Sequence, residues 1–296
     1  MTSCPVATAD PAGLPVFEPD VPLPDPPRRA FVAQIMGLPM SVHLRGPKAH
    51  STRAADAVLG LFAALRADDA TFSTWKPDSE VSRIRRGELR LDDAGPRVRT
   101  VAALCEEAAR RTDGAFSALL PDRDGVPAFD PTGLVKGWAV EQAFRTLLDH
   151  LEPLGEHDAL MSAGGDVVVA CARTDTPDWR IGIENPRDRS RLIVTVPLRR
   201  GAVATSGTVA RGDHIIDPAT GRAPSGLLSA SVIGPTLTWA DVYATAAFVH
   251  DAGAAGWLNT LPGHAAVLVR NDGAVAKVRG PALVHSAASR SAGGTA

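Results

Sequence analysis

The hydrophobic pattern of this chain changes period near its middle, and this change constrains the fold more than any other feature. In the first half, apolar residues recur at helical spacing over residues 51–66, 98–111 and 131–148. From residue 159 onwards, short apolar stretches are separated by Gly, Pro and Asp clusters, which is typical of strands. Helices grouped early and strands grouped late predict an α+β fold with mixed or antiparallel strands and a cleft between the two lobes.

Local signals predict the remaining elements. Two short strands are expected at residues 31–36 and 40–44, joined by a turn, and an N-cap residue with acidic neighbours predicts a short helix over 78–84. A further helix is expected over residues 238–250. The strands of the second half are expected at residues 159–172, 179–184, 192–197, 202–206 and 229–233, followed by a hairpin over 265–278 that turns at Asn271-Asp-Gly273.

Composition bounds the class of protein. The chain has 296 residues, of which 45% are hydrophobic and 22% charged, so it can bury a sizeable core. A net charge of −2 without a basic block gives no indication of a nucleic-acid partner. The sequence predicts a proline-rich arm over residues 1–28, one domain over 29–281 and a flexible tail over 282–296. No stretch could span a bilayer and no signal peptide is recognisable, so we expect a cytoplasmic protein without a membrane anchor.

The segment from Thr238 to Thr245 carries the strongest chemical signal. Asp241 and Thr245 are four residues apart in the predicted helix, so a carboxylate and a hydroxyl share one helical face. A hard cation held against a phosphate group uses such oxygen ligands. The alternative is a capping box, in which Thr238 is the N-cap residue, Asp241 is its partner, and no metal binds.

Three further segments contain residues that either shape the backbone or take part in binding and catalysis. The segment His214-Ile-Ile-Asp-Pro-Ala-Thr-Gly221 is predicted to be the end of a strand followed by a turn at Asp217-Pro218, and His214 is either structural or a proton carrier near neutral pH. The pair Gly164-Gly165 either tightens a hairpin or lets a ligand approach the backbone. Lys136 lies near a predicted helix start, where exposed amides attract anions, although the glycine spacing is not that of a Walker loop.

Together these segments resemble the FAD:protein FMN transferases, the ApbE family. The resemblance covers roughly residues 31–280 and rests on eight motifs in the family's order. They are Met36-Gly37, Ser73-Thr-Trp-Lys-Pro-Asp-Ser-Glu-Val-Ser-Arg83, Gly114-Ala-Phe116, Val135-Lys-Gly-Trp-Ala139, Gly164-Gly-Asp166, Ala204-Thr-Ser-Gly207, His214-Ile-Ile-Asp-Pro-Ala-Thr-Gly221 and Ala240-Asp241 with Thr245. The resemblance implies an enzyme that uses Mg²⁺ and FAD to attach FMN to a Thr or Ser of an acceptor flavoprotein, with release of AMP.

The resemblance also implies roles for individual residues. Asp241 and Thr245 match the side-chain ligands of the metal, and Ala139 is our choice for a backbone carbonyl that completes the site. His214 is the candidate base, a role that Asp241 could share. The positions that match the family's FAD pocket are Met36, Trp75, Ala115, Phe116, Ser117 and Lys136.

One departure from the family pattern keeps other functions open. Ser117 stands where the family commonly has Asp, and the missing carboxylate removes a hydrogen-bond acceptor for the nucleotide. The alternatives are an FAD pyrophosphatase, in which water replaces the acceptor hydroxyl, and a flavin-binding protein with impaired catalysis. Release of AMP from FAD separates the enzymes from the binder, and a mass adduct on an acceptor peptide separates the transferase from the hydrolase.

Overall fold

An eight-stranded sheet, antiparallel throughout, forms the base of the molecule. The computed structural model describes residues 26–121, 125–151, 157–208 and 215–282. The strand order is β1-β2-β5-β6-β9-β10-β11-β12, so two strands from the start of the chain form one edge. The bounds are β1 Arg28–Ile35, β2 Leu38–Arg45, β5 Asp158–Ala163, β6 Asp166–Cys171, β9 Arg200–Gly207, β10 Leu227–Gly234, β11 Ala265–Arg270 and β12 Val275–Arg279.

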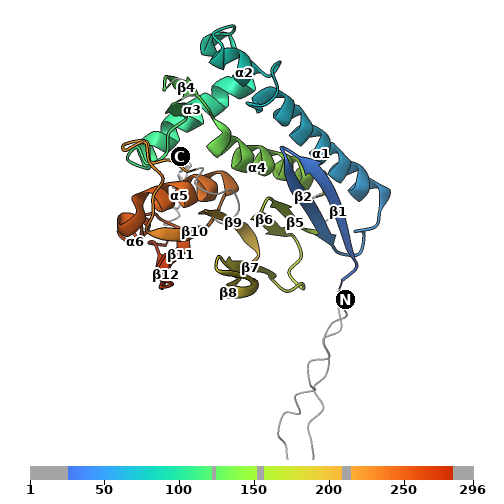
Figure 1. Ribbon diagram of the computed structural model, residues 1–296. Coiled ribbons are helices and arrows are strands. Elements are labelled where there is room, and N and C mark those ends of the chain that lie inside the picture. The colour runs from blue at the N-terminus through green and yellow to red at the C-terminus, as the bar shows by residue number, and fades with distance from the viewer. Residues whose placement is uncertain (1–25, 122–124, 152–156, 209–214, 283–296) are drawn as a thin grey trace, which may run out of the picture.

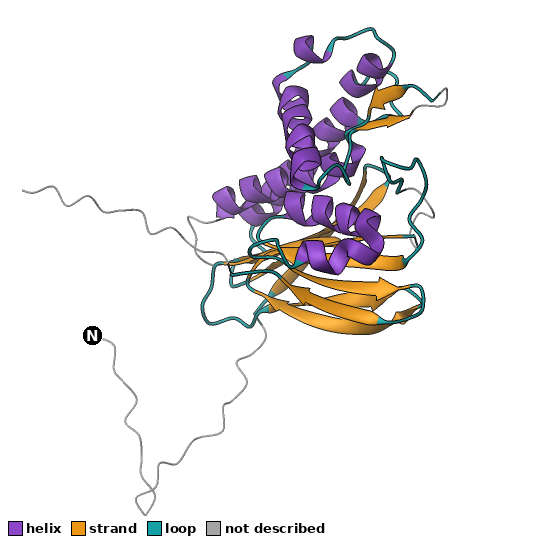
Figure 2. Cartoon of the chain, turned by 90° about the vertical axis from the view of Figure 1, so that its left-hand side faces the viewer, coloured by secondary structure: helices purple, strands orange, loops and turns teal. Residues whose placement is uncertain are grey.

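The helices cover one face of this sheet (Figures 1 and 2). Helix α4 lies between α1 and α5, and α5 packs directly on β9 and β10. Helices α2 and α3, with a small hairpin of β3 and β4, extend the helical lobe away from the sheet (Figure 1). The bounds are α1 Thr52–Phe72, α2 Glu80–Arg85, α3 Pro96–Arg111, β3 Leu119–Pro121, β4 Pro127–Phe129, α4 Thr132–Leu151, α5 Leu237–His250 and α6 Ala254–Leu258.

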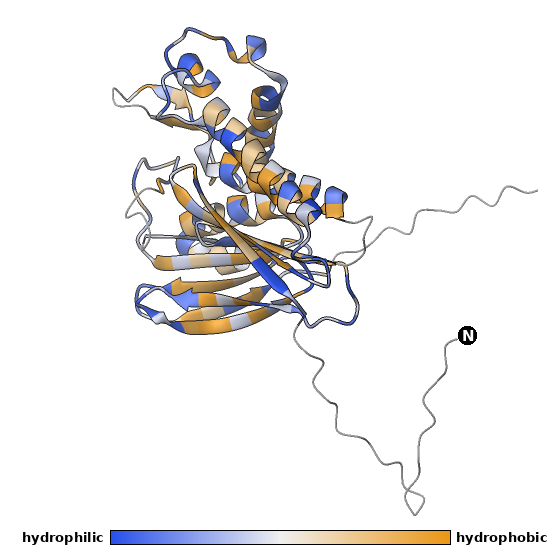
Figure 3. Cartoon of the chain, turned by 90° about the vertical axis from the view of Figure 1, so that its right-hand side faces the viewer, coloured by the Kyte–Doolittle hydropathy of each residue, from blue (hydrophilic) through white to orange (hydrophobic). Residues whose placement is uncertain are grey.

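The two faces of the central strands build two separate cores. Successive side chains of a strand point to opposite faces, so Val168 packs into the large core under the helices and Val169 packs away from it. A hairpin of β7 (Trp179–Asn185) and β8 (Asp188–Leu198) covers that second face. Burial alternates along β7, and Figure 3 shows the matching change between hydrophobic and hydrophilic residues in this hairpin. The hairpin therefore encloses the second core without joining the large sheet.

The predicted α+β class is confirmed, together with each long helix and each strand stretch of the second half. Helix α1 extends six residues beyond the predicted end at residue 66. The short helix α2 begins after Ser79, whose hydroxyl accepts the Ser82 N–H at 2.9 Å, rather than at residue 78. The sequence did not predict β3, β4 or α6, because segments of three to five residues carry too little periodicity.

Two expectations about the chain as a whole meet the structure only in part. The proline-rich arm over residues 1–28 and the tail over 282–296 lie almost wholly outside the described residues, so that division stays a prediction. In the part of the chain that the structure describes, no helix combines the length and the apolar character needed to cross a bilayer.

Candidate active site

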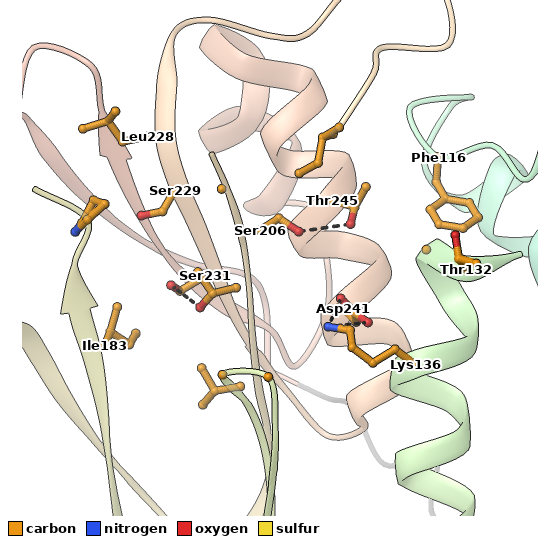
Figure 4. Close-up of a pocket in the computed structure, with 18 of the residues that line it drawn as sticks. Phe116, Thr132, Lys136, Ile183, Ser206, Leu228, Ser229, Ser231, Asp241 and Thr245 are labelled. Atoms are coloured by element: carbon orange, nitrogen blue, oxygen red, sulfur yellow. Dashed lines mark hydrogen bonds and ion pairs between the residues drawn. The ribbon is translucent and has the colours of Figure 1, made fainter. Parts of the chain in front are cut away.

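A pocket of about 390 Å³ opens between the helical lobe and the sheet, where the sequence predicted a cleft. The α3–β3 loop, the first turns of α4 and one face of α5 supply the helical side. The turn between β5 and β6, the β7–β8 hairpin, and strands β9 and β10 supply the other side (Figure 4). Segments far apart in the sequence therefore meet at one concave site, as ligand pockets commonly require.

Helix α5 brings the predicted carboxylate and hydroxyl to this pocket. Asp241 and Thr245 both line it, one helical turn apart on the same face (Figure 4). The Thr245 hydroxyl lies 3.1 Å from the Ser206 hydroxyl on β9. Because Asp241 is only 4% exposed, its carboxylate meets the pocket and not bulk solvent. The predicted juxtaposition of these two oxygen ligands is thus present.

The capping-box alternative for Asp241 is wrong. Helix α5 starts one residue before Thr238, and the N-cap residue is Thr236, whose side chain makes no capping hydrogen bond. Thr238 donates its backbone N–H at 2.9 Å and its hydroxyl at 2.6 Å to Glu141 on the neighbouring helix α4. A glutamate from another helix therefore accepts the Thr238 N–H that a capping box would pair with the Asp241 carboxylate.

Lys136 joins two carboxylates at the floor of the pocket. Its ammonium forms an ion pair with Asp166 and lies 3.3 Å from the Asp241 carboxylate (Figure 4). Burial alone would lower the pKa of Lys136, but the two carboxylates raise it above the ordinary value for lysine. The Lys136 side chain is 20% exposed, so a fixed positive charge is available at the pocket.

The Gly164-Gly165 pair forms the hairpin turn that was one of its two predicted functions, and its place in the pocket lining is compatible with the other, the approach of a ligand to the backbone. Both residues have positive φ, +60° and +101°, and they form the two-residue turn of the β5–β6 hairpin. Both also line the pocket, so the backbone there has no side chain between it and the cavity. The next residue, Asp166, accepts the Thr205 N–H at 3.0 Å while it pairs with Lys136. This double contact fixes the orientation of its carboxylate.

The loop after α3 provides the apolar wall. Ala115, Phe116 and Ser117 all line the pocket, as the resemblance implied. The Phe116 ring lies against the first turn of α4, and a Cβ added at Gly133 would be 3.2 Å from it. Ser117 accepts the Leu119 N–H at 3.0 Å, so its hydroxyl stabilises the turn that leads into β3.

Three predicted site residues lie outside the pocket lining, and a fourth cannot be placed. Met36, in the β1–β2 turn with φ +55°, and Trp75, which is 90% exposed, are not among the lining residues. Ala139 lies within helix α4, fully buried and outside the lining. His214 falls outside the described residues, so the structure leaves its position open.

The stretch after His214 differs from the prediction. The turn is present, since Asp217 accepts the Gly221 N–H at 2.8 Å through its backbone carbonyl. However, Ile215 and Ile216 belong to no strand; instead, both line the pocket. Two apolar residues beside a turn are typical of a strand end, but here these side chains line the pocket and do not pack within a sheet.

Several hydroxyl groups in the pocket were missed by sequence reasoning. Ser229 and Ser231 on β10 and Thr205 and Ser206 on β9 line it, and the Thr205 and Ser231 hydroxyls are 2.8 Å apart. Their available signal was the alternation of serine with apolar residues along β10, which marks one face as polar. The sequence could not indicate that this face of β10 turns toward the β7–β8 hairpin, while Ser206 on β9 points to Thr245 on α5.

The donor set suits a cation that is shared with a ligand. Within the described ranges there is no cluster of three or more His, Cys, Asp or Glu side chains arranged to hold a metal. Mg²⁺ commonly uses only one or two carboxylates, with the remaining positions filled by water and substrate phosphates. Asp241 and Thr245 supply such a partial set at the pocket wall.

Comparisons with known proteins find similar sequences and similar solved structures. The sequence model of the ApbE family matches residues 122–269 of the chain. The FAD:protein FMN transferase of Klebsiella pneumoniae is 27% identical over 241 residues, which cover 63% of this chain and 69% of that protein. The solved ApbE protein of Thermotoga maritima has a TM-score of 0.72 at 21% identity, covering 85% of this chain and 97% of its own. The flavin transferase ApbE from Vibrio cholerae has a TM-score of 0.68 at 20% identity, and the match covers 86% of this chain and 97% of that one.

Proposed function

Because this chain belongs to the ApbE family, we propose that it transfers the FMN moiety of FAD to a Thr or Ser hydroxyl of an acceptor protein and releases AMP. The observation that carries the proposal is the meeting of Asp241, Thr245 and Lys136 at one pocket. These groups are an oxygen donor set for a divalent cation and a fixed positive charge beside it, which is what a pyrophosphate requires.

In this proposal Asp241 and Thr245 would hold Mg²⁺ beside the pyrophosphate of FAD. The bound ion would polarise the phosphoryl oxygens and offset the charge that develops on the leaving AMP. A backbone carbonyl, predicted at Ala139, would be the third metal ligand supplied by the protein. The Ala139 assignment remains a prediction, since this residue lies in the interior of α4 and outside the pocket lining.

The remaining groups bind and orient the nucleotide. Lys136 presents its ammonium to the phosphates, and the serine hydroxyls of β10 can donate to phosphate or ribose oxygens. The Phe116 ring offers an apolar surface for the isoalloxazine or adenine ring. A role for Met36 and Trp75 at the flavin would require contacts outside the pocket lining, so the assignment of these two residues also remains a prediction.

The acceptor hydroxyl must lose a proton as its oxygen bonds to the FMN-side phosphorus. We assign His214 as the base that accepts this proton, with Asp241 as the alternative base. An imidazole with a pKa near 6.5 is suited to this transfer at neutral pH. A cytoplasmic location and a Thr-containing acceptor motif are further predictions that belong with this proposal.

The test combines the protein with FAD, Mg²⁺ and a Thr-containing acceptor peptide, followed by mass spectrometry and measurement of AMP. The proposal expects a peptide carrying FMN and an equal amount of AMP. AMP without an adduct would identify a pyrophosphatase, and neither product would identify a flavin-binding protein. Asp241→Ala should lose both products. The matched control is Asp92→Ala, because that carboxylate is 85% exposed and does not line the pocket.

A further inference from the structure

A buried contact between helices α4 and α5 lies next to the pocket without forming part of its lining. Glu141 on α4 accepts two hydrogen bonds from Thr238 on α5, at 2.9 Å from the backbone N–H and at 2.6 Å from the hydroxyl. The two residues are 5% and 6% exposed. Since the N-cap residue Thr236 gives no side-chain bond, Glu141 takes over the capping of α5 from outside the helix.

The same helix pair meets again one turn away, at the proposed metal ligand. Gly137 precedes Glu141 by four residues on α4, and Asp241 follows Thr238 by three on α5, so each pair shares a helical face. A Cβ added at Gly137 would lie 3.0 Å from the Asp241 Oδ2 atom and 3.2 Å from the Leu237 carbonyl oxygen. The helices therefore touch at Gly137–Asp241 and are tied together at Glu141–Thr238.

We propose that Glu141 is a positioning residue for metal binding, an inference that rests on the proposed function. Its carboxylate fixes the start of α5 against α4 and thereby sets where Asp241 and Thr245 present their oxygens. Its negative charge also lies at the positive end of the α5 dipole, where it stabilises that register. Without this contact, α5 can shift along α4, and a displacement of about 1 Å is enough to impair a metal-centred site.

The two oxygens of Glu141 have separate partners, which makes a precise test possible. Oε2 accepts both bonds from Thr238, whereas Oε1 pairs only with Arg145, whose side chain is 59% exposed. Glu141→Gln can keep an oxygen at the Oε2 position and lose only the Arg145 contact. Arg145→Ala removes the same outer contact and leaves Thr238 bonded. Glu141→Ala removes both.

The experiment measures Mn²⁺ binding directly, from the loss of the free Mn²⁺ signal in electron paramagnetic resonance, with FAD present and acceptor absent. Mutation of residues that orient metal ligands typically weakens metal binding by about 10–100-fold, and we expect Glu141→Ala to fall in this range. Glu141→Gln and Arg145→Ala should have an affinity for Mn²⁺ within about threefold of wild type, because both variants can keep the hydrogen bonds from Thr238 that orient α5. Urea unfolding of each variant reports its folded fraction at the assay temperature.

Each result decides the matter. Glu141→Ala that is less stable but binds Mn²⁺ as tightly as wild type would make Glu141 a structural residue only and overturn the inference. Should Glu141→Ala fail to fold, weakened binding in Thr238→Val supports the inference and wild-type binding overturns it, since that variant removes one of the two bonds. Wild-type protein that binds no Mn²⁺ would overturn the proposed metal site and this inference with it. In the first outcome, by contrast, the wild-type protein binds Mn²⁺ and only the role of Glu141 is refuted.

Discussion

Replacing Lys136 by Met removes the one cation that lies between two buried carboxylates in the described part of the site. Asp166 and Asp241 are 2% and 4% exposed, and Lys136 contacts both. Met has a similar length and an apolar side chain, so it keeps the volume and loses the charge. The variant therefore isolates the electrostatic role of Lys136 from its packing.

The structure sets the size of the effect. At the 3.3 Å separation from Asp241, two unit charges attract by about 5 kcal/mol for an effective dielectric constant of about 20. The cost of removing the ammonium from water offsets much of this attraction. Removal of one partner of a buried ion pair generally costs about 3–5 kcal/mol of the free energy of unfolding. Because the Lys136 side chain is 20% exposed, we expect the lower end, about 3 kcal/mol.

The loss should depend on pH in a defined direction. The two carboxylates hold the folded-state pKa of the Lys136 ammonium above its ordinary value of about 10.4, against the lowering effect of burial. A group with a raised folded-state pKa contributes stability at low pH and loses it as the pH increases through that pKa. The deficit of Lys136→Met relative to wild type should thus be fully present at neutral pH and shrink as the pH rises above about 10.4, where the wild-type protein begins to lose the contribution of its ammonium.

The assay is urea unfolding of both proteins at several pH values, followed by circular dichroism in the presence of a chelator. Lys277→Met is the matched control, because Lys277 is exposed on β12 and its replacement should change stability by no more than about 0.5 kcal/mol. A deficit below about 1 kcal/mol, or one that does not vary with pH, would show that Lys136 does not compensate buried carboxylates.

The other predictions concern four residues. Asp241→Ala should abolish Mg²⁺-dependent turnover while the protein still folds cooperatively in urea; activity close to wild type would remove Asp241 from the metal site. His214→Ala should lower turnover by about 10²–10⁴-fold with little change in FAD affinity, whereas lost affinity at an unchanged maximal rate would make it a binding residue. Trp75→Ala should change stability by no more than about 0.5 kcal/mol, because the side chain is 90% exposed. If Trp75 nevertheless stacks on the ligand, FAD titration will show a loss of roughly 1–3 kcal/mol, and unchanged affinity would exclude this contact. Gly137→Ala should weaken Mn²⁺ binding, because the new Cβ would lie 3.0 Å from the Asp241 carboxylate, and wild-type affinity would mean that α5 tolerates the shift.

The sequence predicted most of the local structure because each long element carries its own periodic signal. Helix α1 buries one apolar stripe that can be read from residue spacing, and α4, which is buried on most sides, keeps apolar residues at helical spacing along its whole length. By contrast, nothing local indicates that the β7–β8 hairpin lies under the sheet while β1 and β2 extend it. Strand order depends on pairing between distant segments, and alternation of polar and apolar residues specifies a face but not a neighbour.

The candidate site was predictable where one helix carries two functional groups. Asp241 and Thr245 could be paired from their spacing of four residues alone. The Lys136 cluster could not be assembled in this way, because its ion pairs join residues that are 30 and 105 positions apart. Glu141 was invisible for the same reason, since a glutamate inside a helix gives no sign that it caps a different helix.

The account's central claim is that a divalent cation binds at Asp241 and Thr245 beside the nucleotide. Crystals of the protein grown with Mn²⁺ and FAD would test it by anomalous diffraction at the manganese edge. The account predicts a peak within about 2.5 Å of an Asp241 carboxylate oxygen and the Thr245 hydroxyl, close to the distances at which such ions bind oxygen. Bound FAD without a peak there, or a peak elsewhere in the pocket, would contradict it.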